Sequence, residues 1–170
     1  MDWVLLILLF LHVAGAIVAF GPTYAFAFIG SMGGKEPQHV NFALRVQEHI
    51  SKGLVFPLAL VQGVTGLLLV WRLSDVSHAS FIDTLAHGWL LTAIVLYLIA
   101  LGNAYFVLIP TGAQLVEATS APPPAPSAGA PAPSGPPPHV AALVSRGRMF
   151  GMINSLLILV IVFLMVTKPF

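Results

Sequence analysis

The sequence predicts an all-α fold, an integral membrane four-helix transmembrane bundle in a single domain, and two observations lead to this. Of the 170 residues, 58% are hydrophobic and only 8% are charged, whereas soluble domains contain about 45 to 50% apolar residues. Four stretches reach the roughly 20 apolar residues that a helix needs to cross the hydrocarbon core. These stretches are apolar on all sides, unlike the alternating strands of a membrane barrel. They predict helices at about 3–30, 52–72, 83–109 and 146–167.

The first helix is expected to remain in the mature chain. Its leading residues, Met1, Asp2 and Trp3, include no Lys or Arg, and its apolar run is too long for the core of a signal peptide. We expect kinks at Pro22 in this helix and at Pro57 in the second, because proline removes a backbone donor. The segment NFALRVQEHISKG before the second helix is interpreted as a polar, helical lead-in.

The connection between the third and fourth helices, at about 119–138, is a proline-rich linker. It holds nine prolines between Pro122 and Pro138, a composition that favours extended chain and cannot form a packed core. Positive charges predict the topology, because Lys and Arg collect on the cytoplasmic side. The first and third connections, with their adjoining helix starts, carry Lys35, Arg45, Lys52, Arg146 and Arg148, and the other side carries Arg72 and Lys168. We therefore expect both termini outside and the proline-rich connection in the cytoplasm.

Several classes of function find no support in the composition. The chain has no cysteine, which excludes disulfides and thiolate chemistry. A net charge of +1 does not suit a nucleic-acid surface, so nucleic acid is not an expected partner. No phosphate-binding loop, GxSxG or HExxH pattern occurs. An enzyme is therefore less expected than a protein without a catalytic centre, and a small transporter or channel component is a third choice.

His12 is the first candidate site residue, because it lies inside an apolar run near the middle of the bilayer. Together with His87 on the third helix it could supply both axial ligands of a b-type haem. Alternatively, a neutral His12 hydrogen-bonds Gln62, Thr65 or a backbone carbonyl and fixes packing. A proton relay or a contact to a quinone is a further alternative.

A pocket for a neighbouring helix or a flat ligand is expected beside Gln62, Gly63 and Gly66 on the second helix. Haem b is the one cofactor that we name as an alternative. We assign no metal site, because three or four of the remaining histidines and carboxylates would have to converge.

Three segments carry a resemblance to a known family: LHVAGAIVAFGPTYAF near the start, PLALVQGVTGLLL in the second helix, and LMVTKPF at the end. Together they resemble a family of bacterial predicted integral membrane proteins of about this length, with four helices and of unknown function. The resemblance implies a bacterial cell membrane and a four-helix bundle. It supplies no catalytic residues.

These observations lead to one functional expectation. We expect an accessory or structural subunit of a bacterial inner-membrane assembly, such as one of electron transport, without its own catalytic centre. Its partners would be the lipid bilayer and other membrane-protein subunits. The alternative is a b-type cytochrome that uses His12 and His87.

Overall fold

The computed structural model describes residues 2–120 and 135–169, and all regular secondary structure within these ranges is helical. The first long helix is α1, and η1 is a short turn that follows it. The complete order is α1 (Trp3–Lys35), η1 (Pro37–His39), α2 (Val40–Ile50), η2 (Ser51–Val55), α3 (Phe56–Ser77), α4 (Phe81–Leu85), α5 (Gly88–Asn103), η3 (Ala104–Leu108), α6 (Ile109–Ala118) and α7 (Pro138–Thr167).

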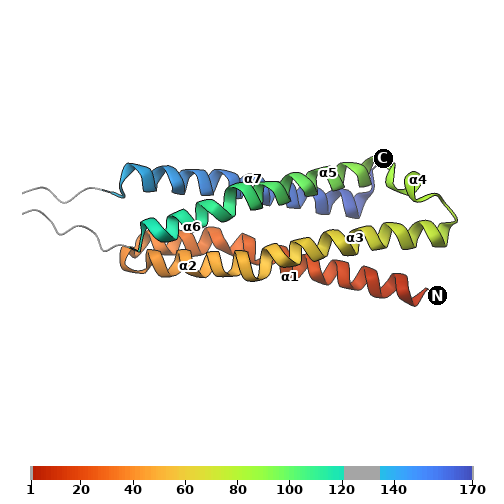
Figure 1. The fold of residues 1–170 in the computed structure, drawn as a ribbon, viewed down its shortest axis with the longest axis horizontal. Helices are drawn as coiled ribbons and strands as arrows, with labels where there is room; N and C mark the ends of the chain where they lie inside the picture. Colours follow the sequence, from red (N-terminus) through yellow and green to blue (C-terminus); the bar gives the residue numbers. More distant parts are fainter. Residues whose placement is uncertain (1, 121–134, 170) are drawn as a thin grey trace, which may run out of the picture.

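Four rods of helix run side by side along the long axis of the molecule (Figure 1). They are α1, the continuous run Val40–Ser77, the continuous run Gly88–Ala118, and α7, and each is long and apolar enough to cross a membrane. Both chain termini lie at one end, here called the terminal end, and the proline-rich connection leaves from the other, the Pro-rich end. The all-α, four-helix membrane fold predicted from the sequence is confirmed.

The rods are longer than the sequence predicted. The lead-in before the second span is fully helical and continues into it without a break. The start of the third helix, by contrast, is later than expected: it was predicted near residue 83 and lies at Gly88, after the separate single turn α4. This break forms where side chains bond back to their own backbone. Ser80 caps α4 by accepting from the amide of Ile82, and the hydroxyl of Thr84 donates to the carbonyl of Ser80 at 3.1 Å.

Proline has one local effect in α1 and another in the two rods that follow it. Helix α1 is a single α-helix from Trp3 to Lys35 with Pro22 inside it. Before Pro57 and Pro110, by contrast, the helix widens into the π-helical turns η2 and η3. Proline offers no N–H to the carbonyl of the preceding turn, and a π turn bonds those carbonyls one residue further along. Phe56 and Tyr105 stack with ring centroids 5.6 Å apart, so the two wide turns are neighbours.

The rods pack as two pairs. Helix α1 packs closely along α3, and α5 packs closely along α7. Toward the Pro-rich end, α2 packs on α6 and α6 on α7, which joins the two pairs there. Nearer the terminal end the pairs are joined by single contacts, such as the hydroxyl of Tyr97 donating to the carbonyl of Ala59 at 2.8 Å.

An ion pair and two tryptophans at the terminal end mark one border of the membrane. Arg72 pairs with Asp2 at 2.8 Å, which places Trp3 and Trp71 at one level, and tryptophan is typical of membrane interfaces. Counting about 20 residues, or about 30 Å of helix, from this level leads to the other border. It falls near Thr23, Lys52, Leu108 and Arg148 on the four rods.

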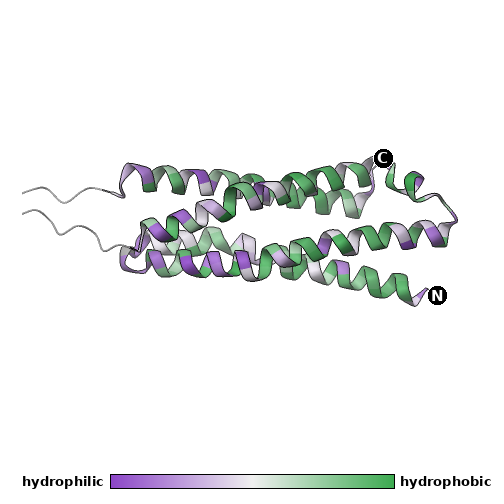
Figure 2. Ribbon diagram, viewed as in Figure 1, coloured by the Kyte–Doolittle hydropathy of each residue, from purple (hydrophilic) through white to green (hydrophobic). Residues whose placement is uncertain are grey.

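The rods continue beyond this second border. The part beyond it, here called the extension, consists of residues 24–35 of α1, 40–50 of α2, 109–118 of α6 and 138–147 of α7. Hydrophilic residues gather toward this end of the molecule, while the opposite part of the rods is mostly hydrophobic (Figure 2).

Candidate functional site: a polar cluster between α1 and α3

His12 faces α3 from the middle of the membrane part of α1. Its ring Nδ1 lies 2.9 Å from the hydroxyl oxygen of Thr65, and the side-chain amide of Gln62 donates to the backbone carbonyl of His12 at 2.8 Å. An unpaired polar group facing hydrocarbon would cost several kcal/mol. The prediction that His12 turns into the protein, toward Gln62 or Thr65, is confirmed.

The hydrogen bonds around His12 favour one tautomer of its ring. The hydroxyl of Thr65 lies 3.1 Å from the carbonyl of Gln62 and donates to it in this arrangement. The oxygen of Thr65 then accepts from the Nδ1–H of His12, because a hydroxyl has only one proton to give. The other ring nitrogen, Nε2, then carries a lone pair, and among the described residues no hydrogen bond reaches it. A bare imidazole nitrogen is a metal ligand or a hydrogen-bond acceptor.

Two glycines provide the room for this cluster. A Cβ at Gly66 would lie 3.2 Å from the ring carbon Cε1 of His12, and one at Gly15 would lie 2.9 Å from the amide oxygen of Gln62. Each polar side chain thus sits over a glycine of the facing helix. Small residues that let helices approach are how membrane helices pack, since lipid removes the hydrophobic drive between them.

A third glycine, Gly63 on α3, faces a side chain from the other helix pair. The hydroxyl of Tyr97, from α5, would lie only 2.6 Å from a Cβ at Gly63. The spaces left by Gly63 and Gly66, where a ligand pocket was expected, therefore hold Tyr97 and His12 of the chain itself. A ligand role for Gln62, Gly63 and Gly66 stays a prediction.

His87 lies apart from this cluster. It is the residue before α5, and its Nδ1 lies 3.1 Å and 3.0 Å from the carbonyls of Asp83 and Thr84. Ten residues, about 15 Å of helix, separate it from Tyr97, which contacts α3 within about one turn of the level of His12. The two imidazoles thus differ in depth by about 10 Å. A haem held by both would need the helices to shift, and the paired site stays a prediction.

A second polar pair joins α5 to α7. The side-chain amide of Asn103 donates to the carbonyl of Phe150 and to the side-chain oxygen of Asn154, both at 3.1 Å. The side-chain oxygen of Asn103 is buried and has no partner among the described residues. This pair was not identified from the sequence.

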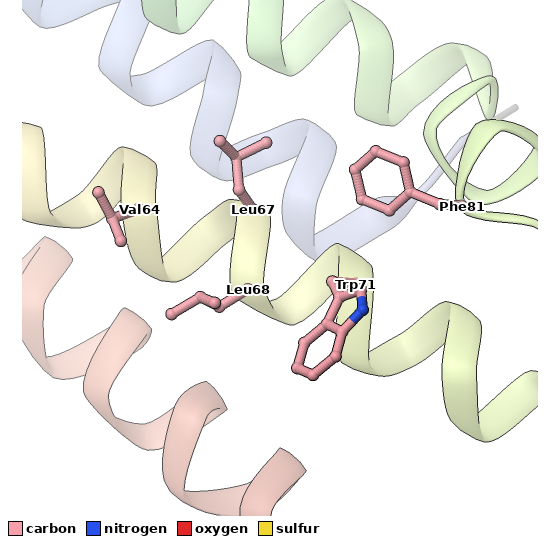
Figure 3. A pocket seen from close by; sticks show the side chains of 5 residues that line it. All are labelled: Val64, Leu67, Leu68, Trp71 and Phe81. Atoms are coloured by element: carbon pink, nitrogen blue, oxygen red, sulfur yellow. The ribbon is translucent and has the colours of Figure 1, made fainter.

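An apolar groove of about 440 Å³ lies near the terminal end, between α3 and α4. Figure 3 shows the five side chains that line it, with Phe81 of α4 pointing toward the side of α3 that carries Leu67. The groove is lined by Val64, Leu67, Leu68, Trp71 and Phe81. None of these side chains ionises or coordinates a metal, so the groove offers no chemistry of its own.

Within residues 2–120 and 135–169, no group of three or more histidines and carboxylates converges as a metal site would require. The candidate site is therefore His12 with Gln62, Thr65 and Gly66. Sequence reasoning did not predict that Tyr97 lies over Gly63 or that Gln62 lies over Gly15. The one sequence signal for the Tyr97 contact was the position of Gly63, three residues before Gly66 on the same helix.

The fold and this cluster together define a multi-pass integral membrane protein whose polar residues at membrane depth bond between helices. The chain belongs to the family described as predicted integral membrane protein (DUF2269), whose model matches residues 6–169. This confirms the resemblance noted from the three sequence segments. No curated protein and no solved structure matches the chain.

Proposed function

We propose that this protein is an accessory or structural subunit of a membrane assembly, without a catalytic centre of its own. One observation carries the proposal. The polar side chains at membrane depth, His12, Gln62, Tyr97 and Asn103, each make at least one hydrogen bond to a facing helix, while Nε2 of His12 and the side-chain oxygen of Asn103 accept none from the described residues. Catalytic and transport sites instead keep such groups open to a cavity. The apolar groove adds no reactive group, so support of other subunits is the role that the geometry favours.

The test is the size and composition of the protein when extracted from its own membrane. A C-terminally tagged chain, expressed at its natural level and solubilised in mild detergent, should migrate on a native gel as a discrete complex. A second polypeptide should accompany it in fixed proportion. The same chain expressed alone in a foreign host provides the size standard. Recovery of the 18.0 kDa chain only as a monomer or homo-oligomer in both hosts contradicts the proposal.

Haem binding is a second candidate, and the free Nε2 of His12 is the observation that favours it. The hydrogen bond from Nδ1 to Thr65 orients the ring, as second-shell partners do for metal-bound histidines. A haem b bound there would give an optical spectrum that changes on reduction with dithionite. His12→Gln should abolish this spectrum, and His87→Gln should do so only if both histidines bind the iron. A purified protein without any such absorption excludes this candidate.

We further propose that the membrane is the bacterial cytoplasmic membrane, with both termini outside and the Pro-rich end inside. The charge count along the sequence supports this orientation. Single cysteines at Ser31 and Ser77 test it with an impermeant thiol reagent on intact cells. Residue 77 should react and residue 31 should not, and the opposite labelling reverses the orientation.

A further inference from the structure

A second groove, here called the elbow groove, lies where α1 ends and α2 begins. It has a volume of about 290 Å³. Its apolar lining consists of Ile29, Met32 and Gly33 of α1 and Phe42, Ala43 and Val46 of α2. Glu36 and His39 complete the lining at the turn between the two helices.

The elbow groove lies in the extension, which the count of about 20 residues from the level of Trp3 and Trp71 places beyond the hydrocarbon core. Gly33 is ten residues past Thr23, which corresponds to about 15 Å of helix outside the border estimated above. Here Met32 is 66% exposed and Phe42 is 68% exposed. Large apolar side chains on the lipid-facing rods are covered by acyl chains, but at this distance they face water. An exposed apolar patch in water marks a site of protein interaction.

The elbow groove is shaped by a close approach of its two helices. A Cβ at Gly33 would lie 3.2 Å from the Cβ of Ala43, so the floor of the groove is packed tightly. Gln47 of α2 donates to the carbonyl of Phe26 of α1 at 3.0 Å, which holds the helices together further along. The groove is therefore present before anything binds, and a partner need not order it.

The charges around the elbow groove are unbalanced. Glu48 pairs with Lys52 at 2.6 Å, whereas Glu36, in the lining itself, lies 3.7 Å from the ring of His39, a contact that is ionic only when the imidazole is protonated. Lys35 and Arg45, by contrast, form no ion pair within the described part of the chain. Arg45 lies one turn after Phe42 on the exposed side of α2. The apolar lining thus has two unpaired cations beside it in the sequence, Lys35 next to Glu36 and Arg45 one turn after Phe42, and one carboxylate, Glu36, at the turn.

We propose that the elbow groove binds a segment of another protein in which apolar side chains are flanked by carboxylates. The apolar side chains would cover Met32 and Phe42, and the carboxylates would face Lys35 and Arg45. A second copy of this chain fits less well, because it would bring the same cations to the interface. This inference rests on the proposed role as an accessory subunit and names the surface through which that role is exercised.

The first test asks whether the elbow groove is in water. The chain has no cysteine, so a spin label on Met32→Cys is unique, and Leu156→Cys on the lipid-facing side of α7 is the matched control. In nanodiscs of phosphatidylcholine and phosphatidylglycerol, residue 32 should collide more with a water-soluble nickel chelate than with oxygen. Residue 156 should show the reverse. An oxygen-accessible residue 32 places the groove in lipid and overturns the proposal.

The second test identifies the occupant. A photo-crosslinking amino acid replaces Phe42 in the full chain in its own cells, and the same amino acid at Gln114, exposed on α6 of the extension, is the control. Position 42 should give an adduct with one other protein, and the crosslinked peptide should contain apolar residues next to Asp or Glu. Arg45→Glu should reduce its yield severalfold, whereas Arg146→Glu, the same charge change on α7, should not.

The outcomes separate this inference from the proposed function. If the native complex forms but position 42 gives no adduct, or gives one with lipid or a second copy, the elbow groove is not the docking surface and the subunit role stands. If no complex with another polypeptide forms, the subunit role fails and the groove loses its proposed occupant. If Arg45→Glu leaves the yield of the adduct unchanged, the role assigned to the cations is overturned.

Discussion

The membrane part of the bundle and the extension differ in what lies over the glycines at their closest helix approaches. In the membrane part, polar side chains lie over glycines of the facing helix, as His12 does over Gly66 and Tyr97 over Gly63. In the extension, Gly33 faces the apolar Cβ of Ala43 instead, while polar side chains donate to backbone oxygens across helices in both parts. Asn41 of α2 donates to the carbonyl of Val116 at 3.0 Å, and Gln47 donates to that of Phe26.

The difference follows from the solvent around each part. Lipid is as apolar as leucine, so helices inside it gain little by burying apolar surface and depend on close approach and hydrogen bonds. Water around the extension restores the hydrophobic drive, and its helices need only one apolar face. Along α2 the exposed positions are Phe42, Arg45 and His49, two of them charged or titratable, whereas along α3 the exposed positions are mostly apolar. A single rod therefore follows two sets of packing rules.

The largest expected effect comes from adding a Cβ at a glycine that faces a side chain of another helix in the membrane part. Gly63→Ala would put a Cβ 2.6 Å from the hydroxyl of Tyr97 and push it off the carbonyl of Ala59. We expect a loss of about 1–3 kcal/mol in the free energy of unfolding, typical of overpacking, measured by titration with SDS in mixed micelles. Gly102→Ala, with nothing within 4 Å of its Cβ, is the control. In a Tyr97→Phe background the loss of stability should be smaller. Equal stability of Gly63→Ala and Gly102→Ala would contradict the close contact between Tyr97 and Gly63.

A smaller effect is expected from the asparagine pair between α5 and α7. The cycle of Asn103→Ala, Asn154→Ala and the double variant should give a coupling free energy of about 0.6 kcal/mol and no more than about 1.7 kcal/mol, as for other polar pairs in membrane helices. Asn103→Ala should cost more than Asn154→Ala, because Asn103 also donates to the carbonyl of Phe150. Strictly additive single effects would show that the two side chains do not interact.

The smallest expected effect is a change in Tm at low pH, and it arises at the first turn of α1. The amides of Leu5 and Val4 and the guanidinium of Arg72 hold the pKa of Asp2 below its ordinary value of 3.8. Since the folded-state pKa is lowered, the stabilisation is complete above about pH 3.8 and is lost as the pH falls through the folded-state pKa. Asn caps helices about as well as Asp, so Asp2→Asn isolates the charge. The small Tm advantage of the wild type over this variant should vanish in acid; a difference independent of pH would mean that the charge is irrelevant.

Apolar length was sufficient to predict the number and order of the membrane helices. The 20-residue requirement depends only on the bilayer, so the four runs could be identified without tertiary information. The partners of His12 were also predictable, because few polar side chains lie at its depth and each needs a partner. The second helix was predicted too short because its lead-in, NFALRVQEHISKG, is polar, and hydropathy identifies segments buried in lipid, not helices as such.

Features that depend on contacts between distant segments were not predictable. The pairing of Asn103 with Asn154 and the seat of Tyr97 on Gly63 require the register between helices, which no single helix encodes. The ion pair of Asp2 with Arg72 likewise joins two rods. The expectation that Gln62, Gly63 and Gly66 form a pocket considered the space that glycine leaves but not the side chains that fill it. Predictions for residues 121–134 lie outside the described residues.

The π turns η2 and η3 affect how sequences of this family should be compared. Each wide turn takes up one residue more than an α-helical turn would, while the helix on either side keeps its own regular spacing. If the α-helical spacing of three and four residues is continued across positions 51–55 or 104–108, the residues that follow are therefore assigned to the wrong side of the rod. A family member with an unbroken α-helix at either place should align with this chain through a gap of one residue inside the helix. Such a gap would mark an inherited insertion rather than an error of alignment.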